Sequence, residues 1–135
     1  MSIVSIRKAL EKHLLALTPA FPTATQNNAF IPTTGVPYQK IHLLPNTPNN
    51  AVQGASMYFE RGIFQITLLW PTGVGAMAAD TRAELIRNHF RRGTSLVESG
   101  ITVHVTNTPS IASAIPDGDR YAVPVSVYWQ AQINL

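Results

Sequence analysis

The chain has 135 residues, of which 45% are hydrophobic and 13% charged, and its formal net charge is +3. This length suffices for one domain that buries about 70% of its unfolded surface. The lack of cysteine excludes disulfides, thiolate nucleophiles and cysteine-based zinc sites, and it fits an intracellular protein. The net positive charge arises because acidic residues are few, not because basic residues form a dense patch, so it supports nucleic-acid binding only weakly.

Apolar residues at helical spacing mark the first element, over about residues 3–17. They are Ile3, Ile6, Leu10, Leu14 and Leu17. Charged residues at 11–13 interrupt this run, so we expect a docked amphipathic helix rather than a signal peptide. No later apolar run reaches the ~20 residues that a membrane-spanning helix needs, which predicts a soluble protein.

Two loops rich in proline, asparagine and threonine separate this helix from the first long strands. The first loop covers about 18–36 and the second covers 45–54, with a strand from Tyr38 to Leu44 between them. A loop of ~19 residues is long for a compact domain, so we expect it to be functional or ordered by a neighbour.

Strict alternation of side chains predicts a strand from Ile63 to Trp70, which ends at Pro71. Arg61 and Gly62 precede it and are interpreted as a hairpin turn between two apolar runs. A second helix is expected over 75–91, with Gly93 as its C-cap.

Two strands are expected after this helix, at 101–105 and at the end of the chain. The last strand places one set of apolar residues on one face: Tyr121, Val123, Val125, Val127 and Trp129. Pro124 cannot donate a backbone hydrogen bond, so we expect an edge or a bulge there. The opposite side of this strand is more polar and could be covered by another subunit.

These elements predict an α+β fold: one mixed or antiparallel sheet of about five to six strands with two helices packed on one face. A single domain over 1–135 is expected, with the sheet and second helix in 37–135.

The sequence contains no specific motif for catalysis. Gly73-Val74-Gly75-Ala76-Met77-Ala78 has the G-x-G-x-x-A spacing of a dinucleotide site, but the second strand is not followed by the acidic residue that would bind the ribose. The carboxylates, histidines and serines show no spacing typical of a metal site or a catalytic triad. We therefore expect no enzymatic activity, no cofactor and no metal.

Four segments resemble a family of small phage proteins related to the tail terminators of long-tailed phages. They are Glu-Arg-Gly-Ile-Phe-Gln-Ile-Thr-Leu-Leu-Trp-Pro-Thr-Gly (60–73), Phe-Arg-Arg-Gly-Thr (90–94), Asn-Thr-Pro-Ser-Ile (107–111) and Asp-Gly-Asp-Arg-Tyr-Ala-Val-Pro-Val-Ser-Val-Tyr-Trp (117–129). Their order and spacing fit over about 35–134, and the N-terminal helix also matches.

The resemblance implies a structural protein of a siphovirus or prophage, located in the tail or neck of the virion and assembled in the host cytoplasm. Terminators of this kind form a hexameric ring on the last ring of the tail tube and present a surface to the head-completion proteins. The implied partners are further copies of this chain, the major tail tube protein and the head-completion or connector proteins, with possible non-specific contact to passing DNA and no membrane. A minor tail or head–tail joining protein is the alternative within the same biology. A small cytoplasmic nucleotide- or nucleic-acid-binding domain is the alternative from another class.

Candidate contacts to neighbouring subunits, tube or lumen come from composition and placement rather than from a motif of the family. The candidate residues are Arg82, Arg87, Arg91, Arg92, Tyr38, Tyr58 and Tyr128. The loops at 22–36 and 45–54 are further candidates. For the arginines, the simpler alternative is a solvated helix end where cations favour the helix dipole.

Overall fold

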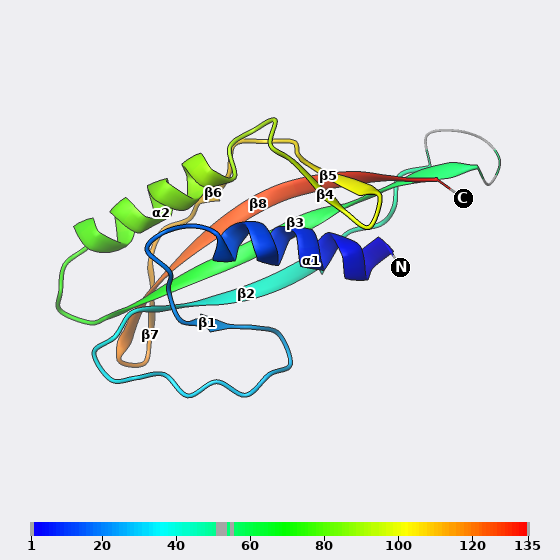
Figure 1. The fold of residues 1–135 in the computed structure, drawn as a ribbon. Coiled ribbons are helices and arrows are strands. Elements are labelled where there is room, and N and C mark those ends of the chain that lie inside the picture. The colour runs from blue at the N-terminus through cyan, green and yellow to red at the C-terminus, as the bar shows by residue number, and fades with distance from the viewer. Residues whose placement is uncertain (1, 51–53, 55, 135) are drawn as a thin grey trace.

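The computed structural model describes residues 2–50, 54 and 56–134 as two helices and a curled mixed sheet (Figure 1). The helices are α1 (Ser2–Leu15) and α2 (Met77–His89). The strands are β1 (Thr23–Ala24), β2 (Tyr38–Pro45), β3 (Met57–Pro71), β4 (Ser95–Glu98), β5 (Ile101–Val105), β6 (Ser110–Ile111), β7 (Ile115–Asp117) and β8 (Arg120–Asn134). Their order in the sheet is β1-β2-β3-β8-β5-β4, and β6 and β7 also pair with β8.

Both helices pack on one face of the sheet and share a single apolar core. Alternate residues of the central strands supply its floor, including Phe64 of β3 and Val125 of β8, both fully buried. Leu10 of α1 and Ile86 of α2 cover them from above. The α+β fold with one sheet and two helices on one face is therefore confirmed, and β1 makes the sheet mixed because it runs parallel to β2.

The long antiparallel pair of β3 and β8 forms the centre of the sheet. Its register runs without interruption from Met57 opposite Asn134 to Pro71 opposite Arg120. The hairpin turn expected at Arg61 and Gly62 is therefore wrong, because both residues lie inside β3.

Gly62 is present in β3 because neighbouring atoms leave no room for a side chain. A Cβ at this position would lie 2.9 Å from the Trp129 ring and 3.0 Å from the Pro45 Cα, and it would overlap the Leu44 carbonyl oxygen. A glycine inside a strand often marks such a close approach.

Pro124 lies in a central strand, so the expected edge is not found there. β8 pairs with β3 on one side and with β5, β6 and β7 on the other. The carbonyl of Pro124 accepts a hydrogen bond from the Ala112 amide, and its nitrogen points to the same side in an antiparallel ladder. On that side β6 ends at Ile111, and Ala112 opposite Pro124 is exposed, so water can take the place of the missing amide donor at the Ala112 carbonyl.

The second helix ends earlier than expected. Its C-cap is Phe90, whose amide bonds the Ile86 carbonyl and whose side chain is fully buried. Gly93 has a φ of 92° but lies three residues farther on, where its amide donates to Val105. The predicted Gly93 cap is therefore wrong: burial of Phe90 turns the chain before the glycine, and Arg91 and Arg92 lie outside the helix.

The long loop after α1 is ordered by contacts within its own chain. It contains β1, and the side-chain oxygen of Gln26 accepts hydrogen bonds from the Arg7 guanidinium and the Leu43 amide, each shorter than 3 Å. Farther along, Phe30 stacks on Tyr38 and covers part of the sheet face opposite the helices. The second expected loop, 45–54, lies partly outside the described residues, and Asn49 pairs with Phe59.

Candidate functional site

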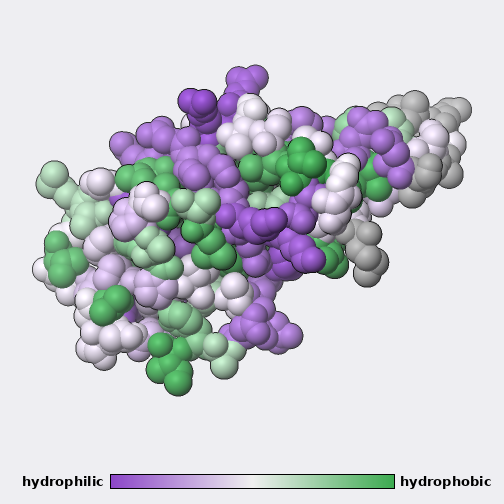
Figure 2. Space-filling model, viewed as in Figure 1, coloured by the Kyte–Doolittle hydropathy of each residue, from purple (hydrophilic) through white to green (hydrophobic). Residues whose placement is uncertain are grey.

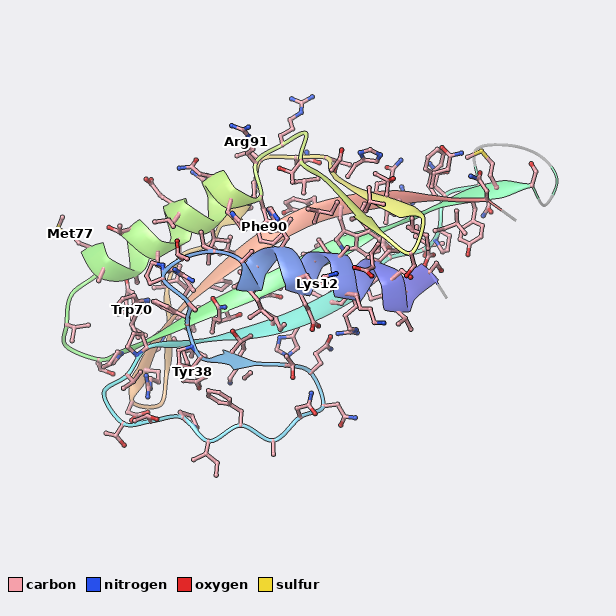
Figure 3. The ribbon with its side chains drawn as sticks, viewed as in Figure 1. Lys12, Tyr38, Trp70, Met77, Phe90 and Arg91 are labelled. Carbon is pink, nitrogen blue, oxygen red and sulfur yellow. The ribbon has the colours of Figure 1, made fainter. Side chains whose placement is uncertain are left out.

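The arginines after α2 form the most exposed basic group of the candidate set. Arg91 and Arg92 are both exposed, and Figure 3 shows Arg91 projecting outward from the end of the helix. Arg87, one helical turn earlier, is half-buried and donates from Nε to the Pro109 carbonyl at 3.0 Å. The geometry therefore leaves two of these three guanidinium groups available to a partner.

Arg82 differs from these arginines because its side chain is buried and bonded within its own chain. The residue is 5% exposed, its Nη1 donates to the Pro19 carbonyl at 2.7 Å, and its guanidinium lies 4.0 Å from the centre of the Phe21 ring. Burial lowers the pKa of Arg82. This arginine ties the loop after α1 to α2, and its guanidinium is not free at the surface.

The three candidate tyrosines also lie in different environments. Tyr38 is 6% exposed, stacked under Phe30, with the Arg120 guanidinium 5.0 Å from its ring centre. Tyr58 is partly buried against the core. Tyr128 lies on the sheet face opposite the helices and is partly exposed.

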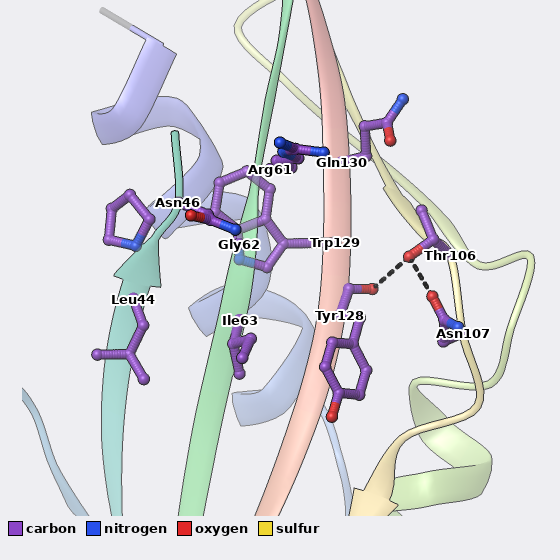
Figure 4. Close-up of a pocket in the computed structure, with 11 residues that line it drawn as sticks. Leu44, Asn46, Arg61, Gly62, Ile63, Thr106, Asn107, Tyr128, Trp129 and Gln130 are labelled. Carbon is purple, nitrogen blue, oxygen red and sulfur yellow. Dashed lines mark hydrogen bonds between the residues drawn. The ribbon is translucent and has the colours of Figure 1, made fainter. Parts of the chain in front are cut away.

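Tyr128 lines a hollow on this open face of the sheet. The strand register puts Leu44, Ile63 and Tyr128 side by side across β2, β3 and β8 (Figure 4). Thr106 borders the same hollow, and its hydroxyl donates to the Asn107 side chain at 2.8 Å. The lining residues include no carboxylate and no histidine, so the hollow suits a contact surface better than acid–base chemistry.

A histidine pair that the sequence analysis missed joins the C-terminal ends of the two helices. His13 Nε2 bonds the His89 carbonyl at 2.8 Å, and His89 Nε2 bonds the His13 carbonyl at 2.5 Å. The rings stack with their centres 3.8 Å apart. Because both acceptors are carbonyl oxygens, each ring carries a proton on Nε2. These residues are 76 positions apart in the chain, so no sequence spacing could have indicated the pair.

Burial lowers the pKa of His13, and the nearby His89 ring acts in the same direction. The hydrogen bond to the His89 carbonyl opposes this shift in part. Next to the pair, the surface is hollowed between His13, His89, Arg91 and Arg92. This basic hollow could accept an anionic group from a partner.

Three loops meet at the other end of the sheet. Arg120 donates to the carbonyls of Thr33 and Val36, and Thr72 donates from its amide to the Asp119 carbonyl at 3.2 Å. Several large apolar residues are exposed at this end of the molecule, the loop end. Ile31 at 91%, Val36 at 39% and Val74 at 58% lie on loops, Met77 at 83% begins α2, and Ile115 at 57% begins β7. Figure 2 shows several separate apolar side chains at this end, with side chains of intermediate hydropathy between them, while polar side chains dominate over α1.

The glycine-rich segment at 73–78 lies in a loop that cannot form a dinucleotide site of the expected type. Gly73 and Gly75 have φ values of 90° and 85°, and they turn the chain from β3 into α2. Both neighbours of β3 in the central sheet, β2 and β8, run antiparallel to it. A dinucleotide fold needs parallel strands joined through the helix.

Within the described residues, no group of three or more histidine or acidic side chains is arranged to hold a metal ion. Neither α1 nor α2 is long and apolar enough to cross a membrane.

Comparison with known proteins provides the family. No curated protein matches the chain. A solved structure that is described only by a sequence identifier aligns with a TM-score of 0.79 and 28% sequence identity, and the alignment covers 100% of this chain and 99% of the other. A family model described as "Phage tail terminator protein" matches residues 5–129. Tail terminators are structural components of the virion tail, and this chain belongs to the phage tail terminator family.

Proposed function

We propose that the chain forms a ring of six copies that caps the tail tube of a long-tailed phage and joins it to the head-completion proteins. The observation that carries this proposal is the family match over residues 5–129, nearly the whole chain. Capping of this kind needs complementary surfaces and neither turnover nor a cofactor.

The surfaces of the molecule support an assembly role. A stable interface commonly buries about 800 Å² of each partner, and exposed apolar residues grouped together often mark such surfaces. The loop end has five exposed large apolar residues, and the open sheet face has Leu44, Ile63 and Tyr128 in one row. Both regions therefore offer contact area that the fold itself does not use.

Ring formation also has a simple geometric basis. A contact between two different patches of identical chains generates a closed ring if its rotation closes, and a filament if it does not. The arginine end of α2 and the loop end are two such different patches.

The test measures mass by light scattering for the protein alone and after mixing with tail tubes that lack a terminator. Tubes that already carry their terminator are the control. A closed oligomer near six copies, or a monomer that binds only uncapped tube ends, would support the proposal. A monomer that ignores both kinds of tube would refute it.

A further inference from the structure

The hollow at the end of α2 is positively charged, and no carboxylate of the residues that the structure describes forms an ion pair with its arginines. Its lining includes His13, His89, Arg91 and Arg92. The ion pairs among the described residues join Arg7 to Glu11 and Lys12 to Glu98, so no described carboxylate lies within 4.0 Å of either hollow arginine.

The turn between β7 and β8 has the opposite character. Asp117 and Asp119 are both exposed on either side of Gly118, whose φ is 62°. The neighbouring Arg120 does not neutralise them, because its guanidinium is directed to the Thr33 and Val36 carbonyls. The amide and hydroxyl of Thr72 both donate to the Asp119 carbonyl, so the turn is already held in place before it meets a partner.

Apolar residues flank both charged groups. Ile115, two residues before Asp117, is 57% exposed. On the other side, a shallow groove that also includes His13 leads from the hollow to Val97, which is 69% exposed, and Leu15 near the end of α1 is 53% exposed. An interface that places apolar contact beside charge pairs would desolvate those pairs and strengthen them.

The two groups cannot meet within one chain. Figure 1 places the β7–β8 turn and the C-terminal end of α2 on different sides of the molecule. A partner that presents a held acidic turn next to an apolar side chain is, however, available as a second copy of the same chain.

We propose that the acidic turn of one copy, Asp117 to Asp119, docks in the hollow formed by His13, His89, Arg91 and Arg92 of the next copy. Ile115 then packs toward Leu15 and Val97 of that copy. This inference rests on the proposed ring and adds the residues that join adjacent subunits. Because the two patches differ, the contact is head-to-tail, which is the kind that a ring requires.

Engineered cysteines test the contact directly, since the natural chain has none. The test variant carries Arg91→Cys with Asp117→Cys, and the matched control carries Arg91→Cys with Asp80→Cys, which lies exposed in the first turn of α2. Both are oxidised alone and on uncapped tail tubes, then run on a non-reducing gel. We expect a ladder of covalent multimers from the test variant and monomers from the control.

Charge reversal provides a second and independent measurement. Arg91→Glu with Arg92→Glu should weaken assembly by roughly 10-fold or more, because it turns attraction into repulsion at the interface. Adding Asp117→Arg and Asp119→Arg in the same chain should restore assembly. Restored assembly would show that the arginine substitutions had not simply unfolded the protein, because a misfolded chain would not be rescued by changes at Asp117 and Asp119.

The outcomes separate this contact from the ring itself. If the protein assembles but the test variant gives no ladder and charge reversal has no effect, the contact is refuted and the ring remains. If reversal instead weakens binding to duplex DNA while assembly is unchanged, the arginines bind phosphate and the contact is also refuted. If no assembly occurs alone or on tubes, the proposed function and the contact fail together.

Discussion

The two faces of the sheet differ in what covers them. The face under α1 and α2 is apolar across β2, β3, β8 and β5 except for the buried Gln39 and Glu60, and its side chains are buried almost completely. The opposite face has one small buried cluster, Tyr38, Leu69 and Ala122 under Phe30. Apart from the row of Leu44, Ile63 and Tyr128, the rest of this face is largely polar and partly exposed. The comparison indicates that the covered face supplies most of the folding free energy, while the open face and the ends of the molecule remain available to partners.

Shortening one side chain on each face should give the largest contrast. Phe64→Ala removes a fully buried ring from the covered face and should cost about 3–5 kcal/mol of unfolding free energy. Ile63→Ala, the adjacent residue on the open face, should cost about 1 kcal/mol or less because Ile63 is only partly buried. Urea unfolding followed by circular dichroism measures both. Equal losses would mean that the open face contributes to the core as much as the covered face.

Enlarging a residue should also reveal how tightly the covered face is packed. Gly62→Ala forces a Cβ against the Leu44 carbonyl and the Trp129 ring, so it should cost about 1–3 kcal/mol. Gln65→Ala on the open face of the same strand is the control, with an expected change within about 1 kcal/mol. The same urea titration applies. An unchanged midpoint for Gly62→Ala would show that the end of β2 moves away without cost.

The comparison extends to the two sides of α2 through its arginines. Arg82→Ala leaves the Pro19 carbonyl without its donor and removes the cation over Phe21, so it should cost about 1–2 kcal/mol. Arg91→Ala is the matched control at the exposed end and should change stability by no more than about 0.5 kcal/mol. If Arg91→Ala weakens assembly without changing stability, and Arg82→Ala lowers stability, the outer and inner roles of these arginines are separated.

The smallest expected effect concerns the histidine pair at the rim of the covered face. The pKa of His13 is lowered in the folded state, so its stabilising contribution is present above the unfolded pKa and is lost as pH falls through the folded pKa. Melting temperature should therefore decrease between pH 7.5 and pH 5.5. His13→Gln should show a smaller decrease, because glutamine does not take up a proton and the contribution of the lowered His13 pKa is removed. An equal decrease in both would place the pH dependence elsewhere.

Part of the candidate site could be predicted from the sequence. The exposed positions of Arg91 and Arg92 follow from a polar segment at the end of an amphipathic helix, and the structure leaves both exposed. The roles of Arg82 and Tyr38 could not be predicted, because Pro19, Phe21 and Phe30, which cover them, belong to a loop without periodicity. The His13–His89 pair depends on how the two helices meet, which no local pattern encodes.

The sequence by itself determined both helices, the alternation of β3 and β8 and therefore the α+β class, because periods of 3.6 and 2 residues report which side of an element is buried. Only the tertiary structure decided that Gly62 lies inside a strand, that Pro124 lies in a central one, and that α2 ends before Gly93. Judged from the local sequence alone, glycine is typical of turns and proline of turns and sheet edges. Their actual positions depend on neighbours far along the chain: the Trp129 ring over Gly62, the gap between β6 and β7, and the core that buries Phe90.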